Sequence, residues 1–215
     1  MVELYGYWRS SASYRVRIAL ALKGIAYVTH PVHLLRDGGE QHQAAYRALN
    51  PQGRVPLLVD GDFRLNQSLA ILDYLEVRHP EPRLVPREPQ LRARMWAFCH
   101  TIAADIQPLQ NTGCLQQLTE RFGADAAART EWMRYWIERG LAVLEQGYAA
   151  EAGDETVLAP GLSLADVLLV PQLYAAERVG ADANLYPRLA AIGERLRRRP
   201  AFITAHPDAQ PDAQS

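Results

Sequence analysis

A proline-rich stretch, HPEPRLVPREP at residues 79–89, separates two parts of the chain that have different hydrophobic patterns. It contains four prolines among charged residues, and proline both ends helices and favours stiff, extended backbone. The chain has 215 residues, which is enough for two modest domains. We therefore predict a first domain over residues 1–80, a linker over 81–89 and a second domain over 90–215.

The first part alternates between strand-like and helix-like patterns, in the order β-α-β-α-β-β-α. Strands are predicted over residues 2–8 and 26–32, and helices over residues 13–24, 42–50 and 68–79. Two more strands are predicted within residues 55–67, on either side of Asp60-Gly61, a dipeptide that suits a tight hairpin. The first domain is therefore expected to be of the α/β class.

The second part is predicted to be all-helical, with helices over residues 90–121, 124–149, 163–178 and 187–198. Ser163 and Asp166 have the spacing of a capping box at the start of the third helix. Pro171 lies inside that helix and should bend it or cost it a hydrogen bond. The tail over residues 205–215 is expected to fray.

Composition argues against several classes of function. Acidic residues (24) and basic residues (23) nearly balance, so bulk charge would not hold the chain to nucleic acid or to a membrane. There is neither a long apolar span nor a secretory signal at the start, so a cytoplasmic location is expected. Cys99 and Cys114 form no C-x-x-C motif and are predicted to be buried packing residues. His30 and His33 lie in predicted strand and loop sequence without the carboxylate arrangement of a metal site, so no metal site is predicted.

Small hydroxylated residues lie between the first strand and the first helix, in RSSASYRVRIAL at residues 9–20. The first N–H groups of a helix are free to bind an anion, and a thiolate is such an anion. A serine hydroxyl together with the positive end of the helix lowers the pKa of a thiol. On this segment alone, the interpretation that Ser10, Ser11 and Ser13 only cap the helix stays open.

Two further segments could bind an extended, peptide-like ligand. A cis bond between Val55 and Pro56 would turn the Val55 backbone outward, although a plain edge proline fits the pattern as well. Gln67 and Ser68 lie at the start of a helix, where Ser68 could cap the helix or help to bind a carboxylate.

Taken together, these segments resemble the zeta class of glutathione transferases, which contains the maleylacetoacetate isomerases. The resemblance keeps its order along almost the whole chain and is carried by residues 9–24, 50–61, 66–76, 106–111, 163–172, 176–178 and 206–212. It implies the glutathione transferase fold, with a thioredoxin-like α/β N-terminal domain and an all-α C-terminal domain. It also implies a homodimer, and glutathione as cofactor.

The resemblance implies roles for particular residues. Ser10 would donate a hydrogen bond to the glutathione sulfur, with Ser11 and Arg15 beside it in the catalytic site. Arg178 would match a position of the family that anchors the substrate. Arg9, which lies beside the serine turn, is a second candidate to anchor a small dicarboxylate substrate, because a guanidinium pairs with a carboxylate in bidentate fashion. The residues that would bind glutathione are Ser10, Ser11, Ala12, Gln41, Val55, Gln67, Ser68, Gln107 and Asn111.

This chain departs from the zeta pattern at one position. The pattern usually reads S-S-C-S, whereas this chain has Ala12 in place of the cysteine. The nucleophile of the implied reaction is the thiol of glutathione and not one of the protein, so Ala12 need not abolish activity.

The implied reaction is the cis–trans isomerisation of maleylacetoacetate to fumarylacetoacetate, in the catabolism of tyrosine and phenylalanine. Addition of a thiolate turns the double bond into a single bond, which can rotate before the sulfur is expelled. Maleylpyruvate isomerisation also fits, favoured by Ala12 but not by Thr112-Gly113, where basic residues would be expected. Two more functions stay open: a transferase that conjugates or dehalogenates small α-halo acids, and a non-catalytic glutathione-fold binding module.

Overall fold

The computed structural model describes residues 1–148, 153, 155–158 and 161–214. The chain divides into two compact units, of which the first is Met1–Arg83 together with Arg199–Ser215 and the second is Leu84–Arg198. The first break lies inside the predicted linker. The second break differs from the sequence-based boundaries, because the C-terminal segment belongs to the same unit as the N-terminal part of the chain.

The first unit is built on a four-stranded sheet. Its strands are β1 (Val2–Gly6), β2 (Tyr27–Pro31), β3 (Leu57–Asp60) and β4 (Phe63–Asn66), in the order β2-β1-β3-β4. The β1–β2 pair is parallel, whereas β1–β3 and β3–β4 are antiparallel. Asp60 faces Phe63 across the predicted hairpin. The predicted order of strands and helices is confirmed, and the unit has the thioredoxin-like arrangement.

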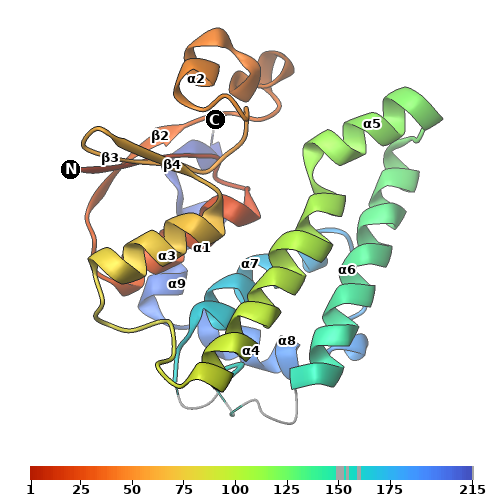
Figure 1. Cartoon of the computed structure of the whole chain (residues 1–215). Coiled ribbons are helices and arrows are strands. Elements are labelled where there is room, and N and C mark those ends of the chain that lie inside the picture. Colours follow the sequence, from red (N-terminus) through yellow and green to blue (C-terminus); the bar gives the residue numbers. More distant parts are fainter. Residues whose placement is uncertain (149–152, 154, 159–160, 215) are drawn as a thin grey trace. The chain divides into compact units, whose positions relative to one another are not determined.

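Helices cover both faces of this sheet (Figure 1). The helices of the unit are α1 (Ser11–Leu22), α2 (Ala44–Leu49), α3 (Ser68–Arg78) and α9 (Pro200–Ala205). In Figure 1, α1, α3 and α9 lie on one side of the sheet and α2 lies on the other. On the α2 side, Tyr46 packs with Val32, Leu57 and Val59 in a buried cluster. Gly24 ends α1 as predicted, with a positive φ of 64°.

The second unit is helical, as predicted, but its first long helix is interrupted. The elements are α4 (Pro89–His100), a π-helix (Thr101–Ile106), two 3₁₀ helices (Gln107–Gln110 and Ala183–Leu185), α5 (Thr112–Phe122), α6 (Ala126–Tyr148), α7 (Leu164–Arg178) and α8 (Pro187–Arg197). The prediction of one helix over residues 90–121 is therefore wrong. The α-helix ends at His100 and is followed by the π-helix. Pro108, which lacks a backbone N–H, and the extended Asn111 then end the helical run, and a new α-helix begins at Thr112.

Helix α7 forms the core of this unit. Its first ten residues are all buried, and the chain remains helical through Pro171. The predicted capping box is confirmed, because Ser163 caps the helix and Asp166 accepts from the Ser163 backbone N–H at 2.8 Å. The predicted helix over 124–149 is present as far as Tyr148, and residue 149 lies outside the described residues.

The prediction that the tail frays is wrong. Two 3₁₀ helices, Pro207–Ala209 and Pro211–Gln214, follow α9, and the Asp212 carboxylate of the tail accepts a hydrogen bond from the Trp8 N–H. In the part of the chain that the structure describes, no helix is long and apolar enough to cross a membrane.

Lys23, the single lysine of the chain, ties the end of α1 to the end of α3. Its Nζ donates to Glu76 Oε2 at 2.8 Å, to the His79 carbonyl at 2.7 Å and to the Pro82 carbonyl at 3.0 Å. The Lys23 side chain is only 1% exposed, so these acceptors replace its hydration.

We expect Lys23→Met to lower the free energy of unfolding by about 2–4 kcal/mol, because Glu76 then stays buried without its nearest cation. Chemical denaturation of both proteins measures the difference. Arg78→Met is the matched control, since the Arg78–Asp60 pair is exposed, spans 4.0 Å and should be worth less than about 1 kcal/mol. Equal losses of unfolding free energy in the two variants would contradict a stabilising role for the buried Lys23–Glu76 pair.

Candidate active site

Ser10 forms the turn between β1 and α1. Its backbone N–H donates to the Tyr7 carbonyl at 3.0 Å, and its Oγ accepts from the Ser13 N–H at 3.2 Å, which makes Ser10 the N-cap of α1. The hydroxyl proton of Ser10 has no acceptor among the described residues and can be donated to a ligand.

The N-terminus of α1 is free to attract an anion. Ser11 and Ala12 are the first two helical residues, whose N–H groups have no partner inside a helix. The first turn contains no acidic residue that would compete with a ligand for these groups. Ser11 is half-buried, and Ala12 is buried.

Arg15 connects the starts of α1 and α3. This arginine is almost completely buried, and its guanidinium donates to Ser68 Oγ at 3.2 Å. Ser68 is the first residue of α3, whose first turn also lacks acidic residues. The structure therefore brings Ser68 to Arg15, a residue of the same helix that Ser10 caps.

Gln67 precedes α3 in a backbone conformation that is unusual for a residue with a side chain. Its φ is +69°, and its Nε2 donates to Gln52 Oε1 at 3.0 Å. Such backbone conformations cost energy and are found preferentially where a ligand is bound. Gln67 is exposed, so its remaining polar atoms can reach a ligand.

The loop before β3 is shaped by Asn50, a residue that the sequence analysis did not single out. Asn50 is 1% exposed, and its Nδ2 donates to the Arg54 carbonyl at 2.7 Å. Its Oδ1 accepts from the Gln52 N–H and from Asn66 Nδ2. This asparagine therefore holds the loop that leads to Val55. The only signal in the sequence was its position in the NPQGR segment.

The peptide bond between Val55 and Pro56 is cis, which is the geometry considered in the sequence analysis. Val55 is partly exposed just before β3.

Gln41 lies in a 3₁₀ helix, Glu40–His42, and is buried. Its Nε2 donates to the Leu34 carbonyl at 3.3 Å and lies 3.1 Å from His42 Nε2. Its Oε1 is buried and has no hydrogen-bond partner among the described residues. The described contacts do not join Gln41 to the Ser10 turn.

The guanidinium of Arg9 stacks on the ring of Trp8, at 5.2 Å from the ring centre. The three other predicted site residues lie in the second unit. Gln107 begins a 3₁₀ helix, Asn111 lies just before α5, and Arg178 ends α7 with its guanidinium 5.9 Å from the centre of the Tyr174 ring.

The cysteines are only partly as predicted. Cys99 is fully buried in α4, but Cys114 in α5 is only half-buried, so the prediction that both are buried is wrong for Cys114. Among the described residues, no three His, Cys, Asp or Glu side chains are placed to hold a metal ion.

These features of the first unit suit one kind of ligand. Two helix N-termini without acidic residues, a donor hydroxyl at Ser10 and the buried guanidinium of Arg15 favour negative charge. Val55, in the loop before β3, is partly exposed. Such an arrangement can bind a small peptide that carries a carboxylate and a thiolate.

The sequence and the fold both match known proteins. Residues 4–83 match the family model of the glutathione S-transferase N-terminal domain. A relative from Vibrio cholerae, described as a probable maleylacetoacetate isomerase, is 49% identical over 210 residues, which cover 98% of this chain and 97% of the relative.

Three solved structures share the whole fold. One is a maleylpyruvate isomerase of the zeta class (TM-score 0.94, 39% identity, 98% of this chain and 99% of that chain). Another is a maleylacetoacetate isomerase from Methylobacterium extorquens with bound malonate and glutathione (TM-score 0.93, 40% identity, 99% and 100%). The third is a maleylacetoacetate isomerase from Anaeromyxobacter dehalogenans with bound dicarboxyethyl glutathione and citrate (TM-score 0.87, 43% identity, 99% and 97%).

Residues 4–83, which make up most of the first unit, are thus a glutathione transferase N-terminal domain. The chain belongs to the maleylacetoacetate isomerase family within the zeta class of glutathione transferases.

Proposed function

We propose that this chain is an enzyme that isomerises maleylacetoacetate to fumarylacetoacetate and uses glutathione as a recycled cofactor. The observation that carries the proposal is the placement of Ser10, whose hydroxyl proton is available at the positive end of α1. The family relationship supports the choice of substrate, because the Vibrio cholerae relative is described as an enzyme of this activity.

The residues of the first unit fit glutathione. Glutathione has a γ-glutamyl carboxylate, a cysteinyl thiol and peptide groups. The N-terminus of α3 with Ser68 and Gln67 suits the carboxylate, and the Val55 backbone suits the peptide. Arg15 adds a positive charge between the two helix ends. We assign glutathione binding also to Gln41, Gln107 and Asn111, on the basis of the sequence resemblance.

Bound glutathione supplies a thiolate that can add reversibly to a conjugated double bond and so allow rotation about it. The protein's part is to keep this sulfur ionised and to orient the substrate. Ser10 donates a hydrogen bond to the sulfur, and the free N–H groups of Ser11 and Ala12 stabilise its negative charge. Both effects lower the pKa of the thiol, so that more of it is ionised at neutral pH.

The two carboxylates of the substrate need cations. We assign this role to Arg9 and Arg178, because guanidinium groups bind carboxylates with two parallel hydrogen bonds. Stacking on Trp8 restricts the Arg9 side chain and therefore reduces the entropy lost when a substrate binds. The relative with bound dicarboxyethyl glutathione supports a site that accepts a diacid joined to the cofactor.

A side-by-side assay tests this proposal. Purified protein is given maleylacetoacetate and maleylpyruvate in turn, while free glutathione is followed during turnover. We expect conversion of maleylacetoacetate with a constant glutathione concentration. Consumption of glutathione would indicate a transferase instead. Inertness towards both diacids would overturn the isomerase assignment, and a calorimetric titration without glutathione binding would indicate a non-catalytic module.

Maleylpyruvate isomerisation is the second candidate. It is supported by the structural match to a maleylpyruvate isomerase and by Ala12 in place of cysteine. Thr112 and Gly113, at the start of α5, supply no positive charge. Comparison of kcat/KM for the two diacids separates these candidates, and we expect the larger value for maleylacetoacetate.

We expect Ala12→Cys to change kcat/KM by less than about fivefold, a difference of about 1 kcal/mol in transition-state energy. Ala12 is buried in the first turn of α1, and the reacting sulfur belongs to glutathione. Steady-state kinetics measures the change. A gain of about a hundredfold would contradict this mechanism, because it would give the protein's own thiol a part in the reaction.

We also propose that the enzyme is a cytoplasmic homodimer, as the family relationship suggests. Light scattering after size-exclusion chromatography tests the assembly, and a monomer at micromolar concentration would contradict it.

A further inference from the structure

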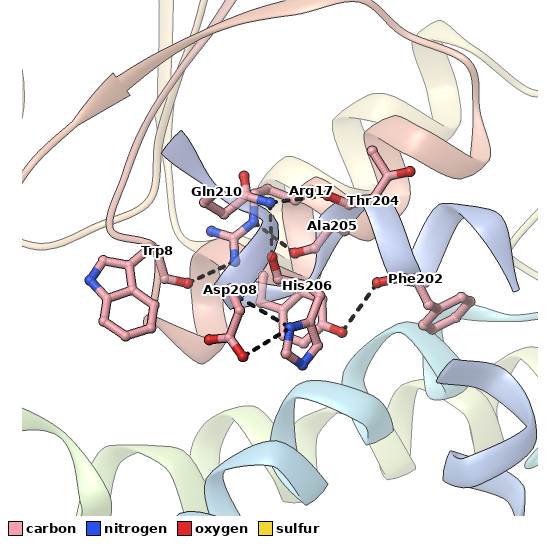
Figure 2. Close-up of polar contacts among 9 residues, drawn as sticks. Trp8, Arg17, Phe202, Thr204, Ala205, His206, Asp208 and Gln210 are labelled. Atoms are coloured by element: carbon pink, nitrogen blue, oxygen red, sulfur yellow. Dashed lines mark hydrogen bonds and ion pairs between the residues drawn. The ribbon is translucent and has the colours of Figure 1, made fainter. Parts of the chain in front are cut away.

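The C-terminal segment, residues 199–214, packs on the helix that Ser10 caps. Helix α9 lies against α1, and both Phe202 and Ala205 are buried in this contact. The hydroxyl of Tyr14, one turn into α1, lies 3.4 Å from the Phe202 carbonyl, to which it donates. Figure 2 shows Phe202 and the turn of chain that follows α9.

Arg17 joins the C-terminal segment to the chain just before Ser10. It is only 3% exposed, and its Nε donates to the Ala205 carbonyl at 3.1 Å. Its two terminal nitrogens donate to the Trp8 carbonyl at 2.8 Å and to the Tyr7 carbonyl at 3.4 Å. In Figure 2, the guanidinium of Arg17 lies between the carbonyls of Trp8 and Ala205.

Asp212 also binds the backbone of Trp8, at its N–H group. Its Oδ2 accepts from the Trp8 backbone N–H at 2.9 Å, and Asp212 itself is nearly buried. The N–H and the C=O of Trp8 are therefore both fixed by charged side chains, and such hydrogen bonds are stronger than neutral ones. Trp8 is two residues before Ser10, inside the turn that the Ser10 N–H closes on Tyr7.

Hydrogen bonds and two 3₁₀ turns within the tail hold Asp212 next to the Trp8 amide. Gln210 donates to the carbonyls of Thr204 and His206, both at 3.0 Å. Pro207 and Pro211 each begin a 3₁₀ turn and restrict the backbone there. These contacts restrict the backbone of the tail up to Asp212, whose side chain binds the Trp8 N–H.

We propose that Asp212 is a positioning residue for the reaction and that, with Arg17, it fixes the Trp8–Ser10 turn and thereby the direction of the Ser10 hydroxyl. The inference rests on the proposed function of Ser10 and adds to it a determinant about two hundred residues away in sequence. Asp212 acts through the backbone of Trp8 and is assigned no contact with glutathione or with the substrate.

The expected effect follows from how steeply catalysis depends on position. A misplacement of about 1 Å at a catalytic group can cost about a hundredfold in rate. Loss of one of the contacts that hold the turn should allow a smaller displacement. Affinity for glutathione depends on many contacts besides this one, so we expect kcat to fall more than KM for glutathione rises.

The test compares Asp212→Ala with Asp212→Asn and Asp208→Ala. An asparagine oxygen can still accept from the Trp8 N–H, so Asp212→Asn should keep most of the activity. Asp208 is the matched control, because it is a carboxylate of the same tail with a side chain that is 74% exposed. A chain that ends at Gln210 serves as a second variant, and thermal melting confirms that each variant is folded.

Three quantities are measured for each variant. Hydrogen exchange of the Trp8 amide, without glutathione, should speed up about tenfold in Asp212→Ala. The thiolate absorbance of bound glutathione, followed against pH, should show a raised thiol pKa. The value of kcat should fall about tenfold while KM for glutathione changes less than about threefold.

Each outcome decides the inference. Unchanged Trp8 exchange in Asp212→Ala would show that Asp212 does not hold the turn. Faster exchange with unchanged thiol pKa and kcat would show that the turn does not govern Ser10. Either result overturns the positioning role while the proposed function stands. A wild-type protein that binds no glutathione would instead overturn the proposed function, and this role with it.

Discussion

Replacing Ser10 with alanine is expected to lower kcat about 10²–10³-fold, which is the usual cost of losing one donor that stabilises a reacting anion. The Ser10 oxygen already accepts a hydrogen bond from the Ser13 N–H, and the Ser10 hydroxyl proton is available to donate to the sulfur. The thiolate absorbance of bound glutathione, followed against pH, should show that the thiol pKa rises towards that of free glutathione. Steady-state kinetics with maleylacetoacetate measures the rate.

Two controls separate catalysis from helix capping. Ser10→Ala also removes the N-cap of α1, which costs about 1 kcal/mol of stability. Ser163→Ala removes the N-cap of α7, a residue with no assigned role towards glutathione, and should leave the thiol pKa unchanged. Ser10→Thr keeps a hydroxyl and should keep much of the rate. If Ser10→Ala binds glutathione and turns over substrate like the wild type, the proposed mechanism fails.

Replacing Asp166 with alanine is expected to lower the free energy of unfolding by about 3–5 kcal/mol, because three buried hydrogen-bond donors lose their acceptor. Asp166 is completely buried, and it accepts from the Val157 N–H, the Ser163 N–H and the Ser163 hydroxyl. Urea denaturation measures the loss. Asp182→Ala is the matched control, since Asp182 caps an exposed 3₁₀ turn and its loss should cost about 1 kcal/mol.

The cost of Asp166→Ala should also depend on pH. Burial raises the pKa of Asp166 to about 6, against the opposing effect of the hydrogen bonds that it accepts. Because the pKa in the unfolded chain is about 3.9, the contribution of this group is fully present below about pH 4 and declines as the pH rises through about 6. The difference between wild type and variant should therefore narrow from about pH 4 to about pH 7. A difference that widens over this range would contradict the raised pKa.

The sequence predicted most elements because local signals agree with the fold. Asp60-Gly61, Gly24 and the Ser163–Asp166 box each lie at the turn, helix end or helix start expected of them. The interruption after α4 was missed, because apolar spacing does not distinguish a π-helix from an α-helix, and Pro108 was the only local signal.

Part of the site depends on contacts between distant segments, which sequence patterns do not reveal. Arg15 was assigned to the site only through the family resemblance, and Arg17 was not singled out at all. Both are buried and hydrogen-bonded to groups far along the chain. Fraying of residues 205–214 was wrongly predicted for the same reason, because this tail is ordered by a contact with residues near the N-terminus. Asn50 was overlooked because its role is to shape a loop.

The burial of Lys23 has a practical consequence. It is the only ε-amino group in the chain, and in the native protein it is enclosed by one carboxylate and two carbonyl oxygens. Reagents that acylate amines can reach this nitrogen only after the ends of α1 and α3 have separated. The rate at which an acyl group appears on Lys23, read by mass spectrometry, therefore reports how often that corner of the protein opens.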